Sequence, residues 1–168
     1  MKRRFKAMGI PADILPADEV VNAVRSLSNR RSAIKILSEL KVRGVEVPSM
    51  PLYLQDADAV AAFVNSMPRC VVKAPWSGSG KGIAWGIGRV ETPMEHFYKG
   101  VIKRQGGVVC EHFLESVQEF AMEFFAGEQG VSFAGYSLFD ANKGSYSGNL
   151  LAPDSSIENI LSQFVPLE

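Results

Sequence analysis

A lysine at the end of an apolar stretch, followed by a glycine-rich segment, is the part of the sequence best suited to chemistry. Residues 71–73 lead into residues 77–82, in which every second position from 78 to 82 is glycine. Glycine frees the backbone to turn its N–H groups towards an anion, and Lys81 and the serine hydroxyls add donors. Because Gly82 follows Lys81 and Ile83 is not glycine, the segment matches neither a Walker A loop nor a dinucleotide fingerprint. We expect a β-hairpin flap over phosphate groups, and a purely structural hairpin is the alternative.

Three charged side chains accompany this segment. Lys73 lies in an apolar stretch, where burial of an unpaired ammonium is costly, so it must face either an anion or solvent. Glu111 follows the apolar residues 108–110, and Glu119 comes eight positions later. An ionised carboxylate can accept two hydrogen bonds from a ribose diol. The alternative is that both glutamates are surface charges on a sheet edge.

The composition predicts a globular protein of one domain or two small lobes. The chain has 168 residues, of which 46% are hydrophobic and 21% charged. No stretch approaches the roughly 18 apolar residues of a membrane span, and no apolar segment follows the basic N-terminus. We therefore expect a cytoplasmic protein without a membrane partner.

Neither cysteines nor histidines are spaced as metal ligands. Cys70 and Cys110 lie in separate apolar stretches without a Cys-x-x-Cys spacing, and we expect reduced thiols in the core. His96 and His112 lack metal-ligand spacing as well, so no metal ligand is assigned.

Charge is unevenly distributed although the net charge is zero. Residues 1–50 contain ten Lys or Arg and five Asp or Glu. The basic residues follow helical periods with few aromatic residues between them, which is typical of solvated helix faces. A nucleic-acid partner is not expected.

The order of predicted elements indicates an α+β fold with two lobes and antiparallel sheets, the glycine-rich hairpin forming a lid. Asp56 is placed to cap a helix, and residues 92–95, Thr-Pro-Met-Glu, have the form of a capping box. We expect irregular structure at residues 1–17 and a loop at 142–148. Helices are expected over residues 18–27, 29–41, 57–66, 92–105 and from 155 onwards, and strands over 71–88 (as a hairpin), 107–114, 119–125 and 131–139.

Taken in order, these motifs resemble the ATP-grasp superfamily. The shared pattern is a basic residue opening a helix, a strand lysine with a glycine-rich flap, an acidic strand end leading to a hinge, and a second acidic residue starting an antiparallel strand. The matching residues are Asn29, Arg30 and 32–34, then 72–82, 109–114, and Glu119 with Phe120. The resemblance covers about residues 28–125. It implies a helical N-terminal segment (1–67), a lid subdomain (68–115) and the start of a C-terminal core (116–168).

The resemblance also implies a role for each matching residue. Lys73 would contact nucleotide phosphates, as would Arg30, which stands where members usually have lysine. Glu119 would hold the ribose hydroxyls, or Gln118 would, because the hinge is one residue longer here. The flap would consist of Ser77, Gly78, Ser79, Gly80, Lys81 and Gly82, and the hinge beside adenine of Glu111, His112, Phe113 and Leu114.

One departure from the superfamily pattern concerns magnesium. Members hold Mg²⁺ with a late acidic residue and a Glu-x-Asn pair, and this sequence contains no Glu-x-Asn. Mg²⁺ is therefore expected only with residues beyond this chain, which would then be part of a longer protein. The implied function is that of the ATP-binding part of a ligase, which activates an unknown small-molecule or peptide carboxylate as an acyl phosphate for attack by an amine or thiol. The alternative is a non-catalytic nucleotide-binding domain with a regulatory or interaction role. No catalytic residue is assigned.

Overall fold

The computed structural model describes residues 2–78, 81–142, 145–165 and 167. The chain divides into two compact units. The first unit comprises Met1–Ser77 and Gly82–Phe113, and the second comprises Gly78–Lys81 and Leu114–Glu168. The division into three parts expected from the sequence stays a prediction. Strand β1 (Leu52–Leu54) and helix α4 (Ala57–Ser66) both precede residue 68 and belong to the first unit, where β1 is part of the sheet.

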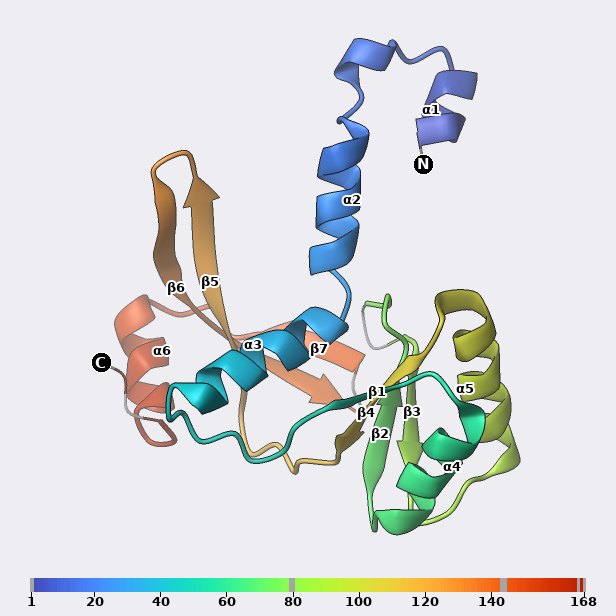
Figure 1. The fold of residues 1–168 in the computed structure, drawn as a ribbon. Helices are drawn as coiled ribbons and strands as arrows, with labels where there is room; N and C mark the ends of the chain where they lie inside the picture. Colours follow the sequence, from blue (N-terminus) through green and yellow to red (C-terminus); the bar gives the residue numbers. More distant parts are fainter. Residues whose placement is uncertain (1, 79–80, 143–144, 166, 168) are drawn as a thin grey trace. The chain divides into compact units, whose positions relative to one another are not determined.

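The first unit is built on a four-stranded antiparallel sheet with the order β1-β4-β2-β3. Helices α4 and α5 lie together beside this sheet in Figure 1. The predicted hairpin is present as β2 and β3, with Cys70 paired to Gly86 and Lys73 paired to Ile83. The elements are β1 (Leu52–Leu54), α4 (Ala57–Ser66), β2 (Cys70–Lys73), β3 (Ile83–Gly86), α5 (Thr92–Gln105) and β4 (Val108–His112).

Alternation along the strands decides which side chains enter the core between this sheet and the two helices. Val72 and Cys110 are fully buried there, with Val60 of α4 and Tyr98 of α5. Both cysteines are free and buried, as predicted. Burial raises the pKa of the Cys110 thiol to about 12 and raises that of Cys70 as well, because a thiolate is poorly solvated in apolar surroundings.

The two predicted helix caps have different outcomes. Asp56 caps α4, and its carboxylate accepts hydrogen bonds from the backbone N–H groups of Asp58 and Ala59. The capping box predicted at residues 92–95 is wrong, since α5 begins after Glu91 without a side-chain cap. Glu95 instead bonds Lys99 one turn later, at 2.5 Å.

Four helical segments precede the sheet: α1 (Lys2–Ala7), a short 3-10 turn (Ala12–Ile14), α2 (Asp18–Leu27) and α3 (Arg31–Val42). The irregular structure expected for residues 1–17 is thus partly wrong. Val20, Val21, Val24 and Leu27 form an apolar face of α2, but no residue of α2 is buried. The apolar residues Ile34, Leu37 and Leu40 on one face of α3 are partly buried. Helix α3 is followed by Gly44 in a left-handed conformation.

The second unit contains a three-stranded antiparallel sheet with the order β5-β6-β7 and one helix. Its core consists of Leu138 from β6 with Ile157 and Leu161 from α6. Strand β7 replaces the loop expected at residues 142–148, because pairing with the long β6 overrides the weak strand propensity of its serines and glycine. The elements are β5 (Glu119–Gly127), β6 (Gly130–Asn142), β7 (Ser145–Asn149) and α6 (Asp154–Leu161).

The architecture is the α+β arrangement with antiparallel sheets that the sequence predicts. Within the part of the chain that the structure describes, no helix combines the length and apolarity needed to cross a membrane.

Candidate functional site

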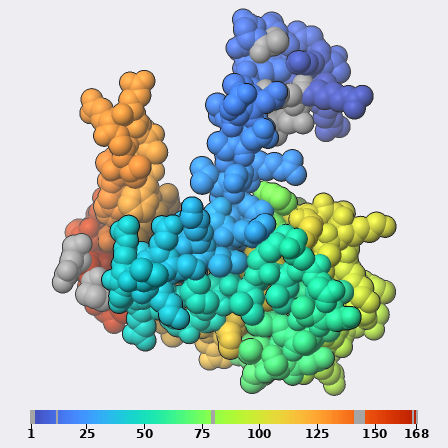
Figure 2. Space-filling model, in the orientation of Figure 1, coloured from blue at the N-terminus to red at the C-terminus, as the bar shows by residue number. Residues whose placement is uncertain are grey.

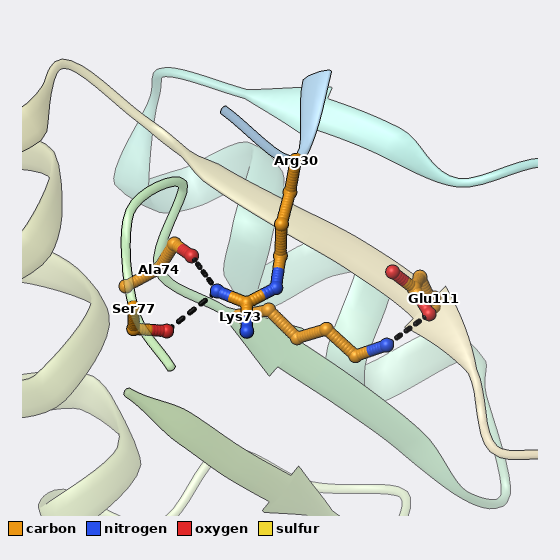
Figure 3. A network of polar contacts seen from close by, with 5 residues as sticks. All are labelled: Arg30, Lys73, Ala74, Ser77 and Glu111. Carbon is orange, nitrogen blue, oxygen red and sulfur yellow. Dashed lines mark hydrogen bonds and ion pairs between the residues drawn. The ribbon is translucent and has the colours of Figure 1, made fainter. Parts of the chain in front are cut away.

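Lys73 and Glu111 form an ion pair on the sheet face turned away from α4 and α5. Strands β2 and β4 pair with Lys73 opposite Val109 and Val71 opposite Glu111, so the two charged residues are diagonal neighbours on one face. Lys73 Nζ lies 2.5 Å from Glu111 Oε2 (Figure 3), and each side chain is 26% exposed. The lysine of the apolar strand therefore does face an anion, and in this structure that anion is a carboxylate of its own chain.

Arg30 reaches the same strand end from the turn before α3. Its Nη1 donates hydrogen bonds of 2.5 Å to the carbonyl oxygen of Ala74 and to Ser77 Oγ (Figure 3). Its backbone N–H also donates to the Pro75 carbonyl at 3.0 Å. A second cation is thus fixed to the residues that follow Lys73, at the base of the flap.

The flap is closed at its base by backbone contacts that require glycine. The N–H of Ala74 donates to the Gly82 carbonyl at 2.8 Å. Gly82 has a φ of +68°, and a Cβ added there would lie 2.6 Å from Ser77 Cβ. Gly78 and Lys81 are joined by a 3.0 Å bond from the Lys81 N–H to the Gly78 carbonyl. Ser79 and Gly80, the remaining predicted flap residues, lie outside the described residues.

Trp76 holds the beginning of the flap to α5. Its backbone N–H donates to Gln105 Oε1 at 3.0 Å, and Gln105 Nε2 donates back to the Trp76 carbonyl at 3.4 Å. Neither Trp76 nor Gln105 was predicted as a functional residue. Their contact pairs residues that are far apart in sequence, and no local pattern signals it.

The predicted hinge begins at the end of β4, and two of its side chains, His112 and Phe113, pack against aromatic rings. His112 meets Phe63 edge-on, with ring centroids 6.3 Å apart, and Phe113 meets Trp85 at 5.6 Å. The guanidinium of Arg69 lies 3.7 Å from the Phe113 ring centroid. Leu114, the last hinge residue, is the first residue of the main segment of the second unit and is exposed.

Glu119 begins β5 in the second unit and carries a buried carboxylate oxygen that lacks a partner. Among the residues that the structure describes, none donates a hydrogen bond to Glu119 Oε2. A buried, unsatisfied oxygen is unfavourable, and native proteins rarely keep one without a ligand or water to bind. The side-chain amide of Gln118, the alternative residue at this position, donates to the Glu119 carbonyl at 3.2 Å.

The structure thus brings together five of the seven predicted residues of the first unit, namely Arg30, Lys73, Ser77, Gly82 and Glu111. The other two, His112 and Phe113, pack against Phe63 and Trp85. Gly78, Lys81, Leu114 and Glu119 lie in the second unit. The pairing of Lys73 with Glu111 was missed from the sequence, because it depends on the register of two strands separated by a hairpin and a helix. The described residues include no group of three or more His, Cys, Asp or Glu that could hold a metal ion.

Comparison with known proteins relates this fold to solved structures. No protein-family model matches the sequence, and no curated protein matches it. N5-carboxyaminoimidazole synthetase from Staphylococcus aureus, solved in complex with ADP, superposes with a TM-score of 0.56 at 13% identity, over 82% of this chain and 36% of that one. The chain has an ATP-grasp-like fold.

A second solved structure with this likeness is D-alanyl-alanine synthetase A from Vibrio cholerae O1 biovar eltor str. N16961. Its TM-score is 0.46 at 15% identity, over 77% of this chain and 44% of that one. Both synthetases are ATP-grasp enzymes. This chain therefore spans less than half the length of either of these structures with an ATP-grasp fold.

Proposed function

We propose that this chain binds ATP as the nucleotide-binding part of an ATP-grasp ligase. The observation that carries the proposal is the meeting of two cations, Lys73 and Arg30, at the base of a glycine-rich hairpin. The likeness of the fold to a synthetase solved with ADP supports it. Lys73 and Arg30 would bind the phosphates, and the flap Ser77, Gly78, Ser79, Gly80, Lys81 and Gly82 would cover them.

The ion pair of Lys73 is compatible with a phosphate ligand. An ammonium has three donors, so Lys73 can keep its bond to Glu111 and still donate to a phosphate oxygen. Glu111 then orients the lysine and offsets its charge when the site is empty. Arg30 likewise retains unused N–H groups after its bonds to Ala74 and Ser77, since a guanidinium carries five donors.

Glu119 supports a nucleoside ligand. Its buried Oε2 is an acceptor without a donor in the described part of the chain, and a ribose diol supplies two O–H donors. Glu119 is a better candidate for this role than Gln118, whose amide is already bonded to backbone. The hinge Glu111, His112, Phe113 and Leu114 would lie beside adenine and contact it mainly through backbone groups.

The reaction of the ligase would proceed by way of an acyl phosphate. A carboxylate oxygen of a small molecule or peptide attacks the γ-phosphorus of ATP and releases ADP. An amine or thiol then attacks the acyl carbon and releases inorganic phosphate. Lys73, Arg30 and the flap N–H groups would stabilise the negative charge that develops on the phosphate oxygens. The described residues include no cluster of three or more His, Cys, Asp or Glu side chains, and the steps above assign no role to Mg²⁺.

Calorimetric titration of the full chain with a non-hydrolysable ATP analogue tests the proposal. Lys73→Ala removes one charged hydrogen bond, and we expect the Kd to rise about ten- to a hundredfold. Lys99→Ala is the matched control, because Lys99 is an exposed lysine of the same unit that pairs with the carboxylate of Glu95 one turn away. An unchanged Kd in Lys73→Ala, or an equal rise in Lys99→Ala, would refute the site.

The second candidate is a domain that binds nucleotide without turnover. The absence of a Glu-x-Asn pair from the sequence favours it. Both candidates predict saturable binding of ATP and loss of affinity in Lys73→Ala. They differ in whether ADP forms when ATP, Mg²⁺, carboxylates and amines are supplied together, which a coupled ADP assay measures.

A further inference from the structure

A pocket of about 550 Å³ lies in the first unit between the end of α2 and the start of α3. Figure 2 shows the face on which these two helices, in blue and light blue, meet. Arg25 comes from α2, Arg31 and Lys35 come from α3, and Trp76 of the flap base completes the wall. This volume is enough for a small-molecule ligand.

The pocket is positively charged. Three cationic side chains line it, and its described lining includes no Asp or Glu. Over the described ranges, no carboxylate forms an ion pair with Arg25, Arg31 or Lys35. The mutual repulsion of the three cations is therefore relieved by no ion pair within the described chain, and an anion of charge two or more would relieve it.

Aromatic rings hold the two arginines of the pocket. The guanidinium of Arg25 lies 5.1 Å from the ring centroid of Trp76, and that of Arg31 lies 4.2 Å from the ring centroid of Tyr53. These contacts position the side chains without neutralising them. Trp76 is fixed in turn, because its Nε1 donates to the Arg25 carbonyl at 2.9 Å and its backbone is bonded to Gln105.

The pocket is separate from the phosphate site proposed above, although the two share neighbouring residues. Arg30 directs its guanidinium to Ala74 and Ser77, whereas Arg31, the next residue, lines the pocket. Trp76 lines the pocket, and Ser77, its neighbour, bonds Arg30. Neither Lys73 nor Glu111 lines the pocket.

We infer that this pocket is a second binding site, which takes a multivalent oxyanion of the class of inorganic phosphate, pyrophosphate and phosphate monoesters. Lys35 supplies an exposed ammonium, and the two arginines supply planar donors suited to oxyanions. Trp76 closes one side of the site and reports on its occupancy. The inference does not depend on the proposed nucleotide site.

Pyrophosphate is the probe for the test, used with the full chain at constant ionic strength. The chain has two tryptophans, so Trp85→Phe leaves Trp76 as the sole indole. We expect a saturable change in Trp76 emission. Calorimetry on the wild type gives the same Kd without relying on the Trp85→Phe fold.

Two charge variants of α3 distinguish a defined site from diffuse attraction. Lys35→Gln is expected to raise the Kd for pyrophosphate about two- to fivefold, the size of one exposed ion pair. Lys41→Gln is the matched control, because Lys41 lies on the last turn of the same helix and outside the pocket. The absence of saturable binding, or an equal effect of the two variants, would overturn the inference.

Lys73→Ala separates this site from the nucleotide site. We expect it to leave pyrophosphate binding at the pocket unchanged, while Lys35→Gln leaves binding of the ATP analogue unchanged. If Lys73→Ala abolishes pyrophosphate binding and Lys35→Gln has no effect, pyrophosphate occupies only the nucleotide site and the pocket is not a second one.

Discussion

Replacing Glu111 with glutamine removes the carboxylate that neutralises Lys73 and keeps the side-chain volume. In the native protein the two side chains are 2.5 Å apart and each retains 26% of its exposure, so the variant leaves a largely buried ammonium facing a neutral amide. Breaking a fully buried pair costs about 3–5 kcal/mol, whereas an exposed pair contributes about 0–1 kcal/mol. For this intermediate burial we expect the free energy of unfolding of the first unit to fall by about 1–2 kcal/mol.

Urea unfolding followed by tryptophan fluorescence measures this effect. Trp76 and Trp85 both belong to the first unit, so their emission reports on that unit even if the two units unfold separately. Glu95→Gln is the matched control. The Glu95 pair with Lys99 has the same 2.5 Å separation but is exposed on a helix, and its loss should cost only about 0.3–0.5 kcal/mol.

A double-mutant cycle isolates the coupling between the two charges. Lys73→Gln and Glu111→Gln together should destabilise by less than the sum of the single changes, since the double variant leaves no buried charge. The reasoning is refuted if Glu111→Gln costs no more than Glu95→Gln, or if the two changes are additive within about 0.3 kcal/mol.

Two further changes test the flap base and a helix cap. Gly82→Ala should lower the free energy of unfolding by about 1–3 kcal/mol and weaken binding of the ATP analogue, because Gly82 has a positive φ and an added Cβ would collide with Ser77. Gly78→Ala is the control: a Cβ at Gly78 meets open space, so this variant should not change thermal unfolding. A loss equal in the two glycine variants would contradict the steric argument. Asp56→Ala should cost about 1 kcal/mol in urea unfolding because two backbone N–H groups of α4 lose their acceptor, and Asp56→Asn should retain most of the stability. Equal losses in those two variants would show that the cap hydrogen bonds are not the cause.

Elements with strong local signals were predicted well from the sequence. The helix over residues 57–66 has a capping aspartate at its start and a proline beyond its end, and both signals act within a few residues. The hairpin of β2 and β3 follows from two apolar stretches joined by a glycine-rich segment. Gly106, in a left-handed conformation, ends α5 where the sequence placed the end.

Features decided by tertiary contacts were not predictable in this way. Strand β7 exists because the long β6 offers an edge for pairing, although Ser145, Gly148 and Asn149 have weak strand propensity. The spacing of the apolar residues in α2 gives that helix an apolar face, but the sequence does not reveal that nothing in the described structure buries it. At α5 the capping residues had the right types, and the helix began one position too early for Thr92 to act as the cap.

In the candidate site as well, the sequence predicts the residues, whereas the contacts between them depend on the tertiary fold. Lys73 and Glu111 were singled out by residue type and chain order, and their direct contact required the register of β2 against β4. The bonds from Arg30 to Ala74 and Ser77 join residues more than 40 positions apart. The basic pocket went unnoticed because Arg25, Arg31 and Lys35 follow the helical period of an ordinary solvated face, and only the fold adds Trp76 to them.

The two buried cysteines make thiol labelling a measure of how often the first unit opens. The second unit contains no cysteine, and in the first unit Cys70 and Cys110 are 1% and 0% exposed. Because burial raises the pKa of the Cys110 thiol to about 12, almost no thiolate exists near neutral pH while the sheet is closed. A thiol reagent can then react with either cysteine only after a local opening that separates the sheet from α4 and α5. The rate of thiol labelling therefore reports the frequency of those openings without any engineered probe. Motions confined to the second unit do not change that rate.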